Sequence, residues 1–174
     1  MRRWLIMLPV FAFLLPVSLL AQSEDVQAIR SGLDGSVQEL QTGVRIHTAS
    51  LIGGVVFPPA WLFGTALGSH QTISAAQDYR DRVMTVWDVD PLPELRGARR
   101  WHLAGMTGHG VAAVGLTSLV VLAVANMDPQ IDVTREAGIA GGVMTGGLLV
   151  GLVGTTVGTW RARNTTLRFH LSLE

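Results

Sequence analysis

The sequence predicts an all-α membrane protein, and two features of the 174-residue chain carry that prediction. Charged residues make up 15% of the chain and hydrophobic residues 48%, whereas a typical soluble domain has roughly 25% charged residues. Segments 104–126 and 137–160 contain no Asp, Glu, Lys or Arg, and each has the length of about 20 residues that a helix needs to cross a bilayer. In order along the chain, we expect a signal peptide, an amphipathic helix, a proline-kinked apolar segment and a glycine-rich antiparallel transmembrane helical hairpin.

Composition argues against several classes of protein. The 13 basic residues, all of them arginines, balance 13 acidic ones, so no basic excess favours binding to nucleic acid. The chain has no cysteine and therefore no disulfide framework, thiolate metal site or cysteine nucleophile.

Residues 1–23 have the layout of an export signal. Two arginines precede an apolar run over 4–20, and small residues at Ala21 and Ser23 form a cleavage site. The prolines in this run would interrupt a spanning helix but are common near a cleavage site, where the chain must be extended. We expect cleavage after Ser23, and an uncleaved anchor helix is the alternative.

The segment 24–48 predicts a polar amphipathic helix, because its apolar residues recur at spacings of three and four. These residues are Val26, Ile29, Leu33, Val37, Leu40 and Val44. The next segment, 49–68, has no charged residue but carries Pro58 and Pro59 at its middle. It is a kinked span, a re-entrant segment or a helix that starts at the prolines, and we favour a kinked transmembrane segment.

Residues 69–103 are polar and rich in arginine, and they predict a helix, a turn and an arginine-rich approach to the membrane. The turn falls at 88–93, where two prolines and two aspartates exclude a helix interior. Aspartates that lie among arginines here are expected to form a solvated, salt-bridged face. They are Asp78, Asp81, Asp88 and Asp90.

A turn at 127–136 joins the two apolar segments into the hairpin. It brings Trp101 and Trp160 to the same side, where indoles commonly anchor at the membrane interface. The tail over 161–174 ends in strict alternation of apolar and polar residues from Leu167, which predicts a short strand or an interfacial segment.

Arginine counts predict the number of crossings. Arginines are fewer in 24–48 and 127–136 than in 69–103 and the tail. If 49–68 spans the membrane, both arginine-rich segments are cytoplasmic, as the positive-inside rule expects. We therefore favour three spans with a cytoplasmic carboxyl terminus. The alternative is two spans with the arginine-rich segments outside.

Small residues predict close packing of the hairpin, because such faces let helix backbones approach each other in lipid. They recur at spacings of three and four on both spans, at Gly105, Gly108, Ala112 and Gly115 and at Gly147, Gly151, Gly154 and Gly158. Another set on the last span points to the opposite face and leaves a groove for a second copy or another membrane protein. That set is Gly138, Gly142 and Gly146. The alternative is that all these glycines serve the hairpin within the chain or reflect the high glycine frequency of membrane helices.

The chain carries no Gly-x-Ser-x-Gly, phosphate-loop or His-Glu-x-x-His pattern, so no enzyme signature is found. His109 lies inside a span, where an ionisable residue is a functional candidate, and His102 lies on the same stripe. Across the helices, His70 could face either of them, so His70 with His109 and His70 with His102 are the two candidate pairs of axial ligands for a haem or another pigment. The simpler alternative is a hydrogen bond between neutral His109 and a nearby carbonyl or hydroxyl group.

We expect a small integral membrane protein of the bacterial inner membrane, with the lipid bilayer as its partner. It has no catalytic role and no cofactor, and it serves as a structural, assembly or accessory subunit. The alternative function is a haem- or pigment-binding electron-transfer subunit that uses His109 with His70 or His102.

Overall fold

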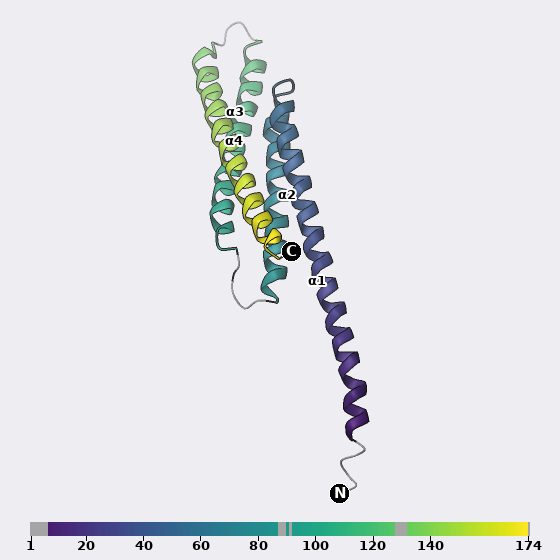
Figure 1. Cartoon of the computed structure of the whole chain (residues 1–174). Coiled ribbons are helices and arrows are strands. Elements are labelled where there is room, and N and C mark those ends of the chain that lie inside the picture. The colour runs from purple at the N-terminus through teal and green to yellow at the C-terminus, as the bar shows by residue number, and fades with distance from the viewer. Residues whose placement is uncertain (1–6, 87–89, 91, 128–131, 174) are drawn as a thin grey trace.

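The computed structural model describes residues 7–86, 90, 92–127 and 132–173, with side chains from residue 26 onward. These residues form four helices and no strand, which confirms the all-helical prediction for the described part of the chain (Figure 1). The helices are α1 (Met7–Gly53), α2 (Pro59–Met84), α3 (Leu95–Ala125) and α4 (Thr134–Leu171).

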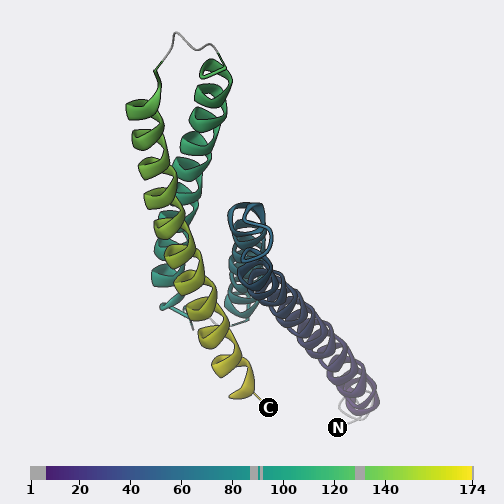
Figure 2. The same cartoon turned by 90° about the horizontal axis from the view of Figure 1, so that it is seen from above.

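The four helices pair as two antiparallel hairpins. α1 lies along α2, and α3 lies along α4 (Figure 1, Figure 2). The two hairpins meet mainly where α2 packs against α4 and α3. Figure 1 shows α1 running past the lower end of the other three helices, whereas α3 and α4 extend beyond the tip of the α1–α2 hairpin at the upper end.

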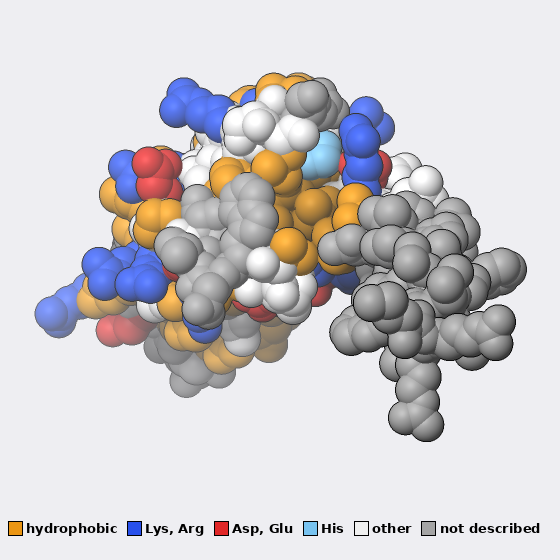
Figure 3. Space-filling view, turned by 60° about the horizontal axis from the view of Figure 1, so that its bottom comes forward, with side chains coloured by type: hydrophobic (Ala, Val, Ile, Leu, Met, Phe, Trp, Pro, Cys, Tyr) orange, Lys and Arg blue, Asp and Glu red, His pale blue; other side chains and the backbone are white. Residues whose placement is uncertain are grey.

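The lower part of the bundle, which we call the polar end, has an apolar interior. It comprises residues 26–45, 71–84, 92–100 and 161–173. Its core consists of Leu33, Val37, Leu40, Ile73, Ala75, Ala76, Tyr79, Val83, Leu92, Leu95, Ala98 and Ala162. Charged side chains gather around the apolar ones on this surface (Figure 3). The polar end therefore has the layout of a water-soluble helical bundle.

The amphipathic helix expected over 24–48 lies within α1 and turns its apolar face toward this core. Leu33, Val37 and Leu40 are buried, and Ile29 and Val44 pack against the core while partly exposed. The first residue of the stripe differs, because Val26 is exposed.

Ion pairs tie the surface of the polar end together. Arg80 donates two hydrogen bonds to the carboxylate of Asp90, at 2.8 and 2.7 Å, and Arg82 pairs with Asp78 at 3.2 Å. The bonds from Arg80 lower the pKa of Asp90 to about 2. The salt-bridged face expected from the sequence is present at these residues. Asp88 lies outside the described residues.

Tyr79 fastens the carboxyl-terminal helix to the polar end. Its buried ring contacts Phe169 and His170 edge to face, at centroid distances of 6.4 and 5.8 Å. Its hydroxyl group lies 3.2 Å from His170 Nδ1, and His170 Nε2 lies 3.5 Å from Asp34. Burial, with a smaller effect of Asp34, raises the pKa of Tyr79 to about 12.

The strand that was one of two expectations for the tail is wrong, because α4 continues to Leu171. Alternation over so few residues is a weak signal, and a helix satisfies its own backbone hydrogen bonds. The helix also places Ala162 and Thr166 on one buried face and brings Phe169 against Tyr79. Helical packing therefore overrides the period of two.

The kinked span expected over 49–68 is also wrong, because the chain reverses there. α1 ends at Gly53 and α2 begins at Pro59, so both ends of the segment point to the same end of the bundle. Pro59 occupies the first turn of α2, where a missing N–H breaks no helical hydrogen bond. A helix does start at the prolines, as the third reading of this segment expected.

Two helices, α3 and α4, are long and apolar enough to cross a membrane. They contain the spans expected over 104–126 and 137–160. The reversal at 54–58 removes the basis for a third crossing at 49–68 and places every arginine-rich segment at the polar end. The expected arginine-rich approach is itself helical and forms the start of α3.

The expected signal peptide is only partly described. Residues 1–6 lie outside the described residues, and residues 7–23 belong to the backbone of α1. Export and cleavage after Ser23 stay predictions.

Candidate site: a polar cluster between the two hairpins

The α3–α4 hairpin forms a closely packed wall on which the cluster is built. A Cβ atom added to Gly147 would lie 2.5 Å from the backbone nitrogen of Ala112, and one added to Gly158 would lie 2.9 Å from that of His102. The other small residues predicted on these faces are also buried between the helices, at Gly105, Gly108, Gly115, Gly151 and Gly154. The two helix backbones therefore touch at these glycines.

The second set of glycines on α4 lies in a different environment. A Cβ atom added to Gly138, Gly142 or Gly146 would meet nothing within 4 Å. One face of α4 is therefore closed by α3, and the face with these three glycines is open, which we call the open glycine face.

His109 lies in the wall, where Gly151 leaves space for its ring. A Cβ atom on Gly151 would lie 2.6 Å from His109 Nδ1. His109 Nε2 lies 3.1 Å from the hydroxyl oxygen of Thr65 on α2. Because the Thr65 hydroxyl donates its single proton to the carbonyl of Trp61, the bond between the helices runs from His109 Nε2–H to Thr65. The buried Nδ1 of His109 has no partner.

His102 makes a second bond between the hairpins. Its Nδ1 lies 2.8 Å from the hydroxyl oxygen of Ser69, and that hydroxyl group donates to the carbonyl of Thr155 at 3.3 Å. His102 Nδ1–H is therefore the donor to Ser69. His70, which is exposed, stacks on His102 with ring centroids 6.0 Å apart and planes at 29°. Of the two histidine pairs expected from the sequence, this is the pair that the structure brings together.

His47, which joins α1 to this cluster, was not predicted from the sequence. Its Nδ1 donates to the carbonyl of Thr65 at 3.0 Å, and its Nε2 lies 3.1 Å from the hydroxyl group of Thr156 on α4. A signal was present, because His47 continues the stripe of Leu40 and Val44 at the same spacing of three and four. On α2, Thr65 and Ser69 lie four residues apart and share a face.

The cluster can hold helices together. It joins hydroxyl, imidazole and carbonyl groups from all four helices, and bonds of this kind stabilise helix association in membranes. Among the described residues, no three His, Asp or Glu side chains are placed to hold a metal ion. The simpler reading of His109, a hydrogen bond to a nearby hydroxyl group, matches its contact with Thr65.

The geometry gives no support to the tetrapyrrole alternative. His70 and His102 face each other as stacked rings, whereas axial ligands point a nitrogen at a metal that lies between them. The ring of His109 is packed on Gly151. Backbone atoms of the opposing helix occupy the space beside Gly105, Gly108 and Gly147.

Comparison of the chain with protein-family models, with curated protein sequences and with solved structures finds no match.

Proposed function

We propose that this chain is a small, non-catalytic integral membrane protein that serves as a structural, assembly or accessory subunit. The α3–α4 hairpin crosses the bilayer, and the polar end projects from one side of the membrane. The open glycine face of α4 packs against a helix of a second copy or of another membrane protein. The observation that supports this function best is the contrast between the closed and open glycine faces.

The surface of the α3–α4 hairpin supports the membrane assignment. Between the tryptophans and the turn, its exposed large side chains are apolar, as a lipid-facing surface requires. They include Leu103, Met106, Val111, Val114, Val120, Val121, Val124, Ile139, Val143, Leu149, Val150 and Val153. Trp101 and Trp160 are exposed where this surface meets the polar end, and Arg163 lies 5.2 Å from the ring centroid of Trp160. Indoles and arginines at this level are typical of a membrane interface.

The open glycine face supports a role in association. Lipid chains are as apolar as leucine, so hydrophobicity does not drive helices together inside a membrane. Faces of small residues do so through close van der Waals contact. The glycines that pack within this chain are already covered by α3, whereas Gly138, Gly142 and Gly146 have nothing within 4 Å of an added Cβ atom.

We place the protein in the bacterial inner membrane, with residues 1–23 as its export signal. α1 runs away from the upper end of the α3–α4 hairpin (Figure 1), so its apolar residues 7–20 do not extend alongside the two spans. Export of the amino terminus would place the polar end outside the cytoplasm and the turn at 127–136 inside. This is the two-span topology. It places the arginine-rich segments outside the cytoplasm, whereas the positive-inside rule alone would place them inside.

Cross-linking tests the association, since the chain has no native cysteine. We expect Gly142→Cys to form a disulfide-linked or maleimide-linked product in native membranes, at twice the mass for a second copy and at another mass for a different partner. Val143→Cys is the matched control, because it lies at the same depth but about 100° around the helix. Equal cross-linking at both positions, or none at Gly142→Cys, would contradict the proposal.

A further inference from the structure

We infer that the α1–α2 hairpin is a re-entrant membrane element whose tip, residues 52–63, lies in the hydrocarbon of the bilayer and does not cross it. This inference rests on the proposed function, because it takes the α3–α4 hairpin as the spanning element. It adds a second membrane-embedded part to the chain, and the occupant that we assign to the surface of the tip is lipid.

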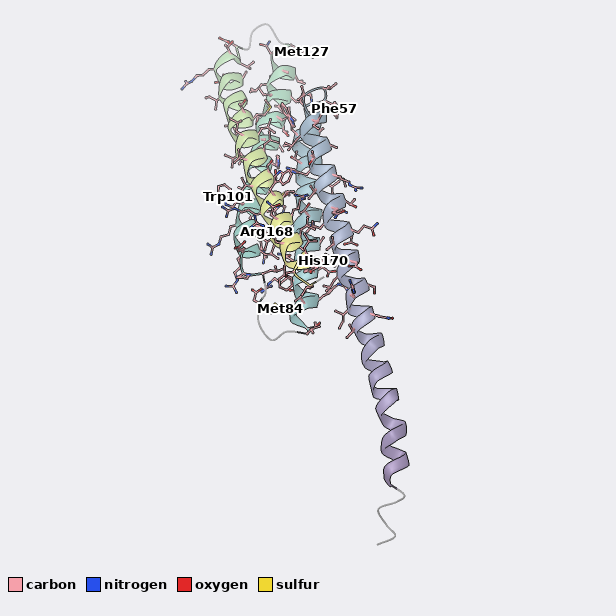
Figure 4. The ribbon with its side chains drawn as sticks, viewed as in Figure 1. Phe57, Met84, Trp101, Met127, Arg168 and His170 are labelled. Carbon is pink, nitrogen blue, oxygen red and sulfur yellow. The ribbon has the colours of Figure 1, made fainter. Side chains whose placement is uncertain are left out.

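Contacts between the hairpins fix the depth of the tip. Thr65 bonds to His109, so these two residues lie at the same level. His109 is eight residues beyond Trp101, or about 12 Å at 1.5 Å per residue, and Phe57 is a further eight residues beyond Thr65. The tip therefore lies roughly 20 Å past the level of Trp101, in a hydrocarbon layer about 30 Å thick. Figure 4 shows the same order, with Phe57 between the levels of Trp101 and Met127.

The side chains around the tip suit lipid and not water. No charged residue occurs between Arg45 and Asp78. Val56 at the tip is 89% exposed. The other exposed large side chains here are also apolar, namely Ile52, Val55, Phe57, Phe63 and Leu67. A soluble protein rarely exposes so continuous an apolar patch, and a patch of this kind marks an interaction surface.

The backbone of the tip supports lipid as the occupant. An unbonded N–H group in hydrocarbon costs several kcal/mol, so irregular backbone rarely faces lipid. In this turn, Gly54, Val55, Val56 and Phe57 all donate to carbonyls of α1, at 2.8 to 3.2 Å. Pro58 and Pro59 have no N–H, and Ala60 and Trp61 donate to Phe57 and Pro58. Every backbone N–H from residue 54 to 61 is thus bonded or absent.

The indole of Trp61 completes this arrangement. The ring nitrogen, Nε1, donates to the carbonyl of Leu51 in α1 at 2.8 Å, so the polar atom of the indole is bonded within the hairpin. The apolar surface of the ring covers Gly54. The prolines, which argue against a spanning helix, are well suited to a reversal in lipid because they remove two donors. The polar groups of the hairpin, His47, Thr65 and Ser69, face α3 and α4 instead of lipid.

Spin-label accessibility tests the inference on the full chain in vesicles of phosphatidylethanolamine and phosphatidylglycerol. Single cysteines replace Val56 at the tip, Val114 on α3 at similar depth and Ser74 at the polar end, all exposed positions. We expect the label at Val56→Cys to collide readily with oxygen and to exclude a water-soluble nickel complex, as at Val114→Cys. The ratio of the two collision rates should be several-fold higher than at Ser74→Cys. Unchanged thermal unfolding of each variant shows that the fold is retained.

The other outcomes separate the two proposals. Nickel access at Val56→Cys with lipid-like behaviour at Val114→Cys would overturn the re-entrant hairpin and leave the spanning hairpin intact. Nickel access at both positions would overturn the proposed membrane function itself. A label at Val56→Cys that neither reagent reaches would show that protein covers the tip, and this would also overturn lipid as its occupant.

Discussion

The two ends of this bundle are built in opposite ways from the same helices. At the polar end the interior is apolar, with Leu40 and Ile73 at its centre, and the surface is charged. At the opposite end, which consists of the apolar parts of α3 and α4 and the upper part of the α1–α2 hairpin, the composition is reversed. The interior there contains His47, Thr65 and His109, and the surface consists mainly of valines and leucines. The difference shows that a helix buries whichever face its surroundings do not solvate.

The two ends are therefore held together by different forces. Water drives the burial of apolar side chains at the polar end, with about 25 cal/mol for each Å² removed from solvent. Lipid provides no such force between helices, so the stability of the proposed spanning hairpin depends on backbone contact at glycines and on hydrogen bonds between helices. The substitutions that follow each change one of these forces, and each of the first three has a matched control site.

We expect the largest effect from Gly108→Leu, which inserts a side chain where α3 touches α4. A Cβ atom at Gly108 would already lie 2.8 Å from the carbonyl oxygen of Gly147. Overpacking against a backbone should destabilise the fold by about 4 kcal/mol or more, or prevent folding. Denaturant unfolding in detergent measures this change. Gly110→Leu, two residues away with nothing within 4 Å, should change stability by less than about 0.5 kcal/mol, and equal losses at both sites would refute the packing argument.

Leu40→Ala should lower the free energy of unfolding by about 3 kcal/mol, since Leu40 is fully buried in the apolar core of the polar end. Leu149→Ala removes the same atoms from the exposed apolar surface of α4 and should cost under about 0.5 kcal/mol. The same unfolding assay compares them. A loss of stability at Leu149→Ala as large as at Leu40→Ala would mean that other parts of the same chain cover this surface of α4.

Thr65→Val removes the hydroxyl group that accepts from His109 and keeps the shape of the side chain. We expect a loss of about 1 kcal/mol, because hydrogen bonds between membrane helices contribute amounts of that order. Thr117→Val is the control, since the Thr117 hydroxyl group is exposed and bonds only within α3, to the carbonyl of Ala113. If both variants unfold alike, the polar cluster does not join the hairpins.

The smallest expected effect is a pH dependence of the polar end. The pKa of Asp90 is lowered to about 2 by the hydrogen bonds from Arg80, so the unfolded chain binds a proton at higher pH than the folded one. This contribution to stability is complete above the ordinary value of 3.8 and is lost as pH falls toward 2. It should amount to less than about 1 kcal/mol, because the pair lies at the surface. Thermal unfolding between pH 5 and 2.5 should be less pH-dependent in Asp90→Asn than in the parent.

Local pattern predicted much of the architecture. The apolar stripe of 24–48 and the two charge-free segments all lie within helices of the structure. Residues 128–131 of the expected turn lie outside the described residues. These features depend on neighbours three or four residues apart, which the sequence displays directly. The strand prediction for the tail was wrong because the alternation of apolar and polar residues there is short. The contact of Phe169 with Tyr79 of α2 favours the helix instead.

The candidate site could be predicted only in fragments. The sequence singled out His102 and His109 because they lie in or beside an apolar segment, and it offered two partners for His70 without deciding between them. Nothing in the order of residues showed that Thr65 and Ser69 would accept from those histidines. His47 was missed because its stripe was followed only as far as Val44.

The sequence by itself therefore determined that this is a helical chain with two membrane-length apolar segments and small-residue faces between them. These properties follow from composition and from the helical period, and both are local. Only the tertiary structure decided that the chain reverses at 54–58, which helix face each histidine meets and which glycines stay uncovered. Those outcomes depend on which helices, distant from each other in the sequence, pack together. The sequence alone does not decide this, because a face of apolar or small residues can pack against several different partners.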